Sequence, residues 1–349
     1  MDISYFIFLS SGLFLGWSLG ANDAANVFGT AVGTKMVRFK TAAAIASLFV
    51  IIGAVFAGGG ASRTLDELGS INALPGAFMV ALSAALAVYM MVNSSIPVST
   101  TQAIVGSIVG WNFYSGHETD MGILTQIVST WIICPFLAGC IATSLYLLIK
   151  CVIKRSKIHL IRQDLYTRLG LIAACAFGAY ALGANNIANV MGVFVESVPF
   201  HPITIGRLNF SGTQILFFIG GLAISCGIFT YSRKIIKTIG KGVMSMSPMI
   251  AWIVVISQSL VLFTFASQGL KNILVENNLP SLPLVPVSSS QAVIGAIIGI
   301  GIAKGGRGIH WEILGKIAVG WVTTPLISAL ICFISLFFLE NVFNLVVYH

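Results

Sequence analysis

Long apolar runs dominate the chain and predict membrane-spanning helices. Residues 79–92 and 327–339 are two clear examples, with almost no polar position in either run. A helix needs about 20 mostly apolar residues to cross a bilayer. Ten segments approach that template, and short polar connections separate them. The predicted crossings are residues 5–34, 41–60, 75–92, 94–113, 122–149, 169–195, 208–231, 246–268, 283–303 and 312–340.

The composition supports the same fold class. Apolar residues make up 57% of the 349 positions and charged residues only 9%, and the mean hydropathy is +0.95. A soluble domain has about 25% charged residues. This deficit excludes a soluble enzyme, a disordered chain and a nucleic-acid binder. We therefore expect an all-α polytopic membrane protein, located in the cell membrane.

The charges are distributed unevenly between the two predicted sides. Cytoplasmic loops of membrane proteins are rich in Lys and Arg. With the N-terminus outside, 15 of the 19 basic residues fall on the inner side, so we predict that both termini lie outside. The inner residues are Lys35, Arg38, Lys40, Lys150, Lys154, Arg155, Lys157, Arg162, Arg168, Arg233, Lys234, Lys237, Lys241, Lys304 and Arg307. The outer acidic residues are Asp2, Asp66, Glu67, Glu118, Asp120, Glu196, Glu276 and Glu340.

Three sequence blocks occur twice in the same order. GANDAANV at 20–27 reappears as GANNIANV at 183–190, and PVSTTQA at 97–103 reappears as PVSSSQA at 286–292. Trp131 and Pro135 match Trp321 and Pro325. The repeat predicts a first transmembrane unit over 1–149, a basic cytoplasmic linker over 150–168 and a second unit over 169–349. Five crossings per unit would make the second unit inverted, an arrangement typical of secondary transporters.

Asp23 lies inside a predicted crossing and needs charge compensation. An ionised Asp at the bilayer centre costs roughly 2.5–3.5 kcal/mol even on a lenient insertion scale. No Lys or Arg occupies the middle of an apolar segment. A bound cation or a proton remains, and carboxylate, amide and freed backbone oxygens suit a cation such as Na+. Gly20 and Gly29 around the first motif lower the cost of breaking the helix there, and we expect broken or re-entrant helices at the midplane of both units.

The two PVS blocks predict an anion site. Each block places three consecutive hydroxyls and a Gln directly after a Pro, which suits the first turn of a helix. The free N–H groups of a helix start attract anions. Two such starts from opposing units could hold one oxyanion, although helix capping alone is the competing explanation.

Signatures of catalysis are missing from the sequence. No P-loop occurs, no G-x-S-x-G elbow occurs, and no His lies near either PVS block. We therefore expect no enzyme and no cofactor. Uphill transport would have to use an ion gradient.

At GANDAANVFGTAVG (20–33), its echo GANNIANV and the PVS blocks, the chain resembles the inorganic phosphate transporter family, the phosphate-permease group of sodium- or proton-coupled carriers. The resemblance implies an inverted-repeat carrier that moves phosphate with Na+ or H+. It implies phosphate ligands Asp23, Asn26, Ser99, Thr100, Thr101, Asn189, Ser288, Ser289 and Ser290. The sodium ligands that we expect are Asn22, Asp23, Asn26, Gln102, Asn185, Asn186, Asn189 and Gln291, with no other metal.

This chain departs from the family pattern at three positions. Asn186 stands where the second motif often has Asp, and Gln102 and Gln291 stand where the family often has His. Without a His in the core, a histidine proton relay is excluded, which favours Na+ over H+. The loss of one carboxylate could change the ion stoichiometry or the anion preference.

The leading hypothesis is a sodium-coupled importer of inorganic phosphate that works by alternating access around a midplane site. A sulfate or other oxyanion carrier of the same fold and a proton-coupled phosphate symporter are the alternatives. A passive channel is a further class that the sequence leaves open. Expected partners are phosphate, sodium and the lipid bilayer but no nucleic acid, and a homodimer is left open.

Overall fold

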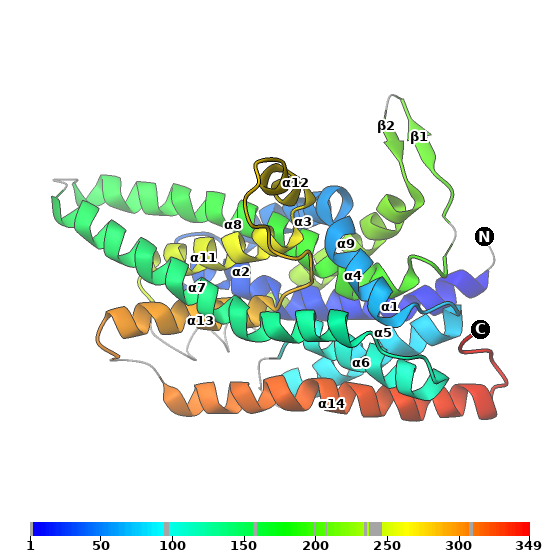
Figure 1. The fold of residues 1–349 in the computed structure, drawn as a ribbon. Coiled ribbons are helices and arrows are strands. Elements are labelled where there is room, and N and C mark those ends of the chain that lie inside the picture. The colour runs from blue at the N-terminus through cyan, green and yellow to red at the C-terminus, as the bar shows by residue number, and fades with distance from the viewer. Residues whose placement is uncertain are drawn as a thin grey trace.

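The protein is a bundle of long helices arranged side by side along one axis (Figure 1). The structure is a computed structural model that describes residues 3–93, 98–155, 159–198, 200–206, 208–233, 236, 246–306 and 310–349. The helices and strands are α1 (Ile3–Asn22), α2 (Ala24–Gly33), α3 (Phe39–Ala57), α4 (Gly59–Gly69), α5 (Leu74–Asn93), α6 (Thr100–Ser115), α7 (Met121–Arg155), α8 (Leu160–Met191), the 3-10 turn η1 (Gly192–Phe194), β1 (Ile203–Ile205), β2 (Leu208–Phe210), α9 (Gly212–Thr230), α11 (Pro248–Ala266), α12 (Gln268–Glu276), α13 (Ser289–Ala303) and α14 (Trp311–Asn341).

Each of the ten predicted crossings contains a helix. Among the described residues, seven helices are long and apolar enough to span a membrane: α3, α5, α7, α8 with η1, α9, α11 and α14. The segments predicted at 94–113 and 283–303 contain only the shorter helices α6 and α13, of 16 and 15 residues. At 1.5 Å per residue they are roughly 24 Å long, less than the bilayer core. The residue before each helix, Ser99 for α6 and Ser288 for α13, is extended and buried. Both helices therefore begin inside the protein.

The predicted linker at 150–168 consists largely of helix. α7 continues to Arg155 and α8 begins at Leu160, so the two helices form a long hairpin that extends to one end of the bundle (Figure 1). Both chain ends lie at the opposite end. The basic residues Lys157, Arg207, Lys234, Lys237, Lys241 and Arg307, the acidic Asp2, and Pro97 lie outside the described residues.

Helices from the two sequence repeats exchange packing partners. α3 packs on α8 while α9 packs on α1, and α6 packs on α14 while α13 packs on α7. In Figure 1, α7 runs away from the end that holds both termini, whereas its repeat counterpart α14 runs back toward that end. This matched pair of helices therefore points in opposite directions.

Matched glycines allow these helix pairs to approach closely. A Cβ on Gly20 would overlap the carbonyl oxygen of Ile224, and a Cβ on Gly183 would overlap that of Val50. In the same way, a Cβ on Gly106 would overlap the carbonyl oxygen of Pro325, and a Cβ on its counterpart Gly295 would overlap that of Pro135. The repeat is thus visible in the packing, because equivalent glycines contact equivalent backbone atoms.

The half-buried Asp66 on α4 lies close to two other carboxylates. α4 is too short and too polar to span a membrane, and it packs on η1 at the start of the turn that carries Glu196. Burial and the neighbouring carboxylates of Glu196 and Glu67 raise the pKa of Asp66 to about 6. Ionisation of Asp66 is therefore less favourable in the folded protein than in the unfolded chain.

We predict that Gly106→Ala destabilises the protein strongly, because its methyl group would have to displace the backbone of α14 at Pro325. The unfolding free energy should fall by about 1–3 kcal/mol, the usual cost of overpacking a core. Thermal unfolding of the purified protein in detergent measures this. Gly315→Ala on α14 is the matched control, because nothing lies within 4 Å of its added Cβ. Equal midpoints for the two variants would contradict the packing argument.

A second prediction concerns pH. The folded-state pKa of Asp66 lies above its ordinary value, so the folded protein holds this proton more tightly than the unfolded chain does. Stability from this group should therefore be greatest below about pH 4 and should decline as the pH rises through about 6. Asp66→Asn should raise the unfolding midpoint at pH 7.5 and flatten this part of the pH profile. A lower midpoint at pH 7.5 would show that the ionised carboxylate is stabilising instead.

Candidate functional site

The first GAN motif lies where one long helix is interrupted. α1 ends at Asn22, α2 begins at Ala24, and Asp23 forms a single turn residue between them. The N–H of Asp23 still donates to Leu19, but the N–H of Asn26 donates to the carbonyl of Asp23, three residues back. The second motif differs, because α8 continues through Asn185, Asn186 and Asn189 without interruption. The expected break therefore occurs in the first repeat only.

Asp23 is buried among neutral groups. Its side-chain oxygens accept hydrogen bonds from Asn22 Nδ2 at 2.9 Å, Thr100 Oγ1 at 3.5 Å and Asn186 Nδ2 at 3.5 Å. Within the described part of the chain, the side-chain ion pairs are Arg63–Glu67 and Lys316–Glu312, both on the surface. No described basic side chain neutralises this carboxylate.

Asn186 takes part in the same contact from the second repeat. Its Nδ2 faces Asp23, while its Oδ1 accepts from Asn185 at 2.8 Å and from Asn189 at 3.2 Å. An Asp at this position would have no N–H to donate and would bring a second negative charge close to Asp23. The departure at position 186 therefore changes the polarity of the site at its centre.

The two hydroxyl motifs lie at the starts of α6 and α13, and hydrogen bonds join these two helix starts. Ser99 caps α6 by accepting from the N–H of Gln102, and Ser288 caps α13 by accepting from the N–H of Gln291, both at 3.3 Å. Thr101 donates to the carbonyl of Val287, and Ser290 donates to the carbonyl of Val98. Capping thus occupies the first hydroxyl of each triplet, and the third hydroxyl of each triplet joins the two starts.

The asparagines attach each GAN motif to these helix starts. Asn22 Nδ2 contacts the carbonyl of Val98 at 3.4 Å, and Asn185 Nδ2 contacts that of Val287 at 2.7 Å, while Asn185 Oδ1 accepts from the N–H of Val287. Asn26 reaches Ser289 at 3.4 Å, and Asn189 reaches Thr101 at 2.9 Å. All these side chains are buried. The residues singled out in the sequence therefore converge on one polar cluster.

Several oxygens in this region have no partner. Gln102 and Gln291 hold equivalent positions on α6 and α13, and their Oε1 atoms are buried without a hydrogen-bond partner among the described residues. Asn189 Oδ1 is in the same condition. An unsatisfied buried oxygen costs roughly 1–3 kcal/mol, so such atoms indicate a missing donor or cation. The unpartnered oxygen of Asn189 belongs to the cluster through its contacts with Thr101 and Asn186, and the Gln102 and Gln291 side chains lie on the first turns of the helices that the cluster joins.

A residue outside the repeated motifs also joins the cluster. Gln258 on α11 is fully buried, and its Nε2 donates to the carbonyl of Asn26 at 2.9 Å. Sequence analysis did not single it out. The available signal was a Gln within the predicted crossing 246–268, which is otherwise strongly apolar.

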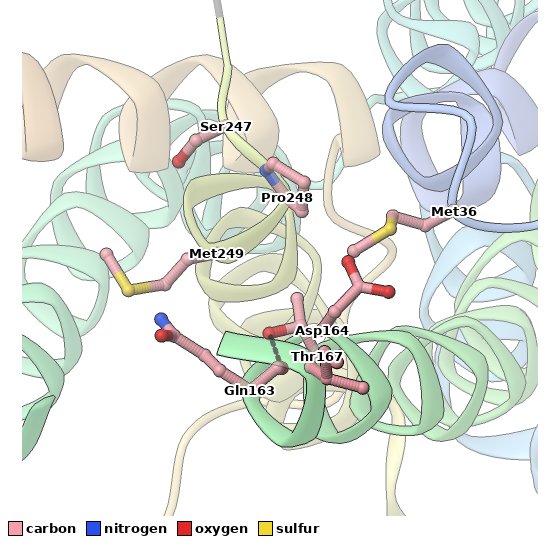
Figure 2. Close-up of a pocket in the computed structure, with 8 residues that line it drawn as sticks. Met36, Gln163, Asp164, Thr167, Ser247, Pro248 and Met249 are labelled. Carbon is pink, nitrogen blue, oxygen red and sulfur yellow. Dashed lines mark hydrogen bonds between the residues drawn. The ribbon is translucent and has the colours of Figure 1, made fainter. Parts of the chain in front are cut away.

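Two hollows lie near the first motif and near the starts of α8 and α11. One of about 110 Å³ lies beside α2 and is lined by Ala25, Gly29 and Thr30 among others, so it begins next to the first motif. A larger one, of about 660 Å³, lies between the starts of α8 and α11. Figure 2 shows Asp164 pointing toward Met36 across it, and no residue of the repeated motifs lines it.

We predict that Asn185→Leu destabilises the protein. The leucine has a similar volume, but it leaves both the N–H and the carbonyl of Val287 without their side-chain partner in a buried setting. The expected loss is about 2 kcal/mol or more in unfolding free energy, measured as a lower thermal midpoint. Asn209→Leu, on the exposed strand β2, is the control. A variant with a wild-type midpoint would show that water replaces Asn185 at no cost.

Comparison with known proteins places this geometry in a family. The Phosphate transporter family model matches residues 19–332. A "putative phosphate permease" of Methanocaldococcus jannaschii is 28% identical over 334 residues, covering 96% of this chain and 97% of that protein. Another protein with that name, from Thermococcus kodakarensis, is 25% identical and covers 95% and 96% of the two chains.

A solved structure has the same fold. The structure titled "The sodium-dependent phosphate transporter" superposes with a TM-score of 0.76 at 19% identity, covering 96% of this chain and 98% of that one. The recognised resemblance and the predicted multi-pass helical membrane fold are thereby confirmed. This chain belongs to the phosphate transporter family.

Proposed function

We propose that the protein imports inorganic phosphate together with sodium, using the polar cluster as a shared site. The observation that carries this proposal is Asp23, a buried carboxylate surrounded by amides and hydroxyls and paired with no described cation. A mobile cation would supply the missing charge. The name of the solved neighbour, a sodium-dependent phosphate transporter, supports sodium as that cation.

The cation would lie among neutral oxygens and one carboxylate. The proposed sodium ligands are those implied by the sequence: Asn22, Asp23, Asn26, Gln102, Asn185, Asn186, Asn189 and Gln291. The unpartnered oxygens of Gln102, Gln291 and Asn189 support this set, because amide oxygens are hard, neutral ligands. Asn22 and Asn185 are more fully engaged with the backbone of the PVS blocks, so their support is indirect.

The anion would lie where the starts of α6 and α13 are joined. N–H groups in the first turns of α6 and α13 attract negative charge, and the two helices contribute this effect from opposite repeats. Thr100 and Ser289 are the middle hydroxyls of the two triplets, and Thr100 already contacts Asp23. An anion near Asp23 would be repelled unless a cation bound as well. That mutual requirement gives a positive coupling free energy between the two ligands.

Alternating access follows from the repeat. The matched helices α7 and α14 run in opposite directions (Figure 1), and hydrogen bonds of the polar cluster join residues of the two repeats. In inverted-repeat carriers, movement of one part against another exposes such a site to each side in turn. The proposed orientation places both termini outside and the α7–α8 turn inside the cell.

We expect purified protein in proteoliposomes to take up radiolabelled phosphate when an inward sodium gradient is imposed. Replacement of Na+ by choline should abolish uptake, and excess unlabelled sulfate should leave it unchanged. Uptake driven by a proton gradient without sodium would favour a proton symporter. Competition by sulfate would assign another oxyanion preference.

Asp23→Asn should reduce sodium-driven uptake at least about tenfold, because the neutral amide removes the charge that holds the cation. The fold should survive, since Asn has the same shape and can still accept hydrogen bonds. Asp164→Asn, at the exposed end of α8, is the control and should transport normally. Wild-type uptake by Asp23→Asn would overturn the role proposed for this carboxylate.

A further inference from the structure

Gln258 is a buried polar side chain in the middle of the membrane-spanning helix α11. Its neighbours on α11, Ser257 and Ser259, donate to carbonyls of their own helix, at Ile253 and Val255. Those hydroxyls are therefore satisfied locally. Gln258 instead reaches across to α2 and the first GAN motif.

The orientation of its amide is fixed by its partner. A backbone carbonyl can only accept, so the group that faces Asn26 at 2.9 Å has to be the NH2 end of Gln258. The Oε1 atom then faces away from that carbonyl. It is buried and has no hydrogen-bond partner among the described residues. A buried amide oxygen in this state requires a donor or a cation.

Only one of the two repeats provides this amide. The offset of 174 residues that relates Gly53 to Gly227 also relates Ser83-Ala84-Ala85-Leu86 to Ser257-Gln258-Ser259-Leu260. Ala84 therefore occupies the equivalent position in the first repeat. The extra amide contacts the motif that contains Asp23, and the equivalent motif contains Asn186. The two groups that have no equivalent in the other repeat, the Asp23 carboxylate and the Gln258 amide, therefore lie at the same motif: Asp23 is part of it and Gln258 contacts it at Asn26.

We propose that Gln258 is a ligand of the sodium site formed at Asp23, and that it makes this side of the cluster the stronger cation site. Its Nε2 positions the first turn of α2 through the carbonyl of Asn26, and its Oε1 supplies a neutral oxygen to the ion. Asn26 is held from the other side by Ser289 of the second hydroxyl motif. Gln258 therefore connects cation binding with the helix start proposed for the anion. This inference rests on the sodium-coupled function proposed above.

The test compares sodium binding in four forms of the intact protein. Thermal unfolding midpoints in detergent are measured during titration with NaCl at constant ionic strength, with choline chloride as the balancing salt and without phosphate. A ligand that binds only the folded state adds RT ln(1 + [L]/Kd) to the unfolding free energy, so the midpoint begins to rise once the sodium concentration reaches Kd. The forms are the wild type, Gln258→Met, Gln258→Glu and the control Ser257→Ala. The half-saturating sodium concentration for phosphate uptake in proteoliposomes is measured in parallel.

Gln258→Met preserves the length of the side chain but removes the oxygen, so it should raise the half-saturating sodium concentration at least about tenfold. Gln258→Glu keeps an oxygen at this position and, in its protonated form, can still donate to the carbonyl of Asn26, so it should stay within about threefold of the wild type. Ser257→Ala should match the wild type. If Gln258→Met does not fold, a rise in half-saturating sodium of tenfold or more in Gln258→Glu overturns the proposal, and a near-normal value supports it.

Two other outcomes overturn the proposal and are distinguishable from each other. If sodium shifts the wild-type midpoint and Gln258→Met responds at the same concentration, Gln258 has a structural role only, and the sodium-coupled function stands. If sodium shifts neither the wild-type midpoint nor wild-type uptake, the proposed coupling ion is wrong and this inference fails with it.

Discussion

The structure depends on one electrostatic constraint, the burial of the Asp23 carboxylate among neutral groups. Nothing described within its contact distance carries a positive charge, and its partners are amides and hydroxyls contributed by both repeats. Such an arrangement is costly in a membrane interior unless a cation or proton enters. The unpartnered oxygens in this region suit a cation, and the starts of α6 and α13, which hydrogen bonds hold together, suit an anion.

Repetition provides the geometry of this site. Each GAN motif donates to the backbone of a PVS block through its first asparagine, and each PVS block donates to the other through its third hydroxyl. The contacts are equivalent although the side chains are not identical. Two pairs of equivalent positions carry different side chains: Asp23 corresponds to Asn186, and Gln258 corresponds to Ala84. The first GAN motif therefore has a negative charge and an additional amide contact that the second motif lacks.

Much of this could be read from the sequence. Hydropathy placed a helix in every predicted crossing, and the repeated blocks identified residues that are hundreds of positions apart yet lie together in the fold. The helix break expected at the second GAN motif is absent from the structure, because glycines lower the cost of interrupting a helix without requiring an interruption. Sequence also could not show that Ser99 and Ser288 cap their own helices, since capping and ligand binding use the same hydroxyls. Gln258 escaped attention because it belongs to no repeated block.

The exchange of partners between repeats has a consequence for biosynthesis. α1 packs on α9, α3 on α8 and α6 on α14, so contacts of the first half are completed by residues made 120 to 230 positions later. During translation the early helices enter the membrane with their close-packing glycine faces unfilled and their asparagines without PVS partners from the second half. Folding of the polar centre therefore waits for α13, whose start carries the second PVS block. A chain that terminates early would leave intramembrane polar groups exposed, which gives membrane quality control a clear feature to recognise.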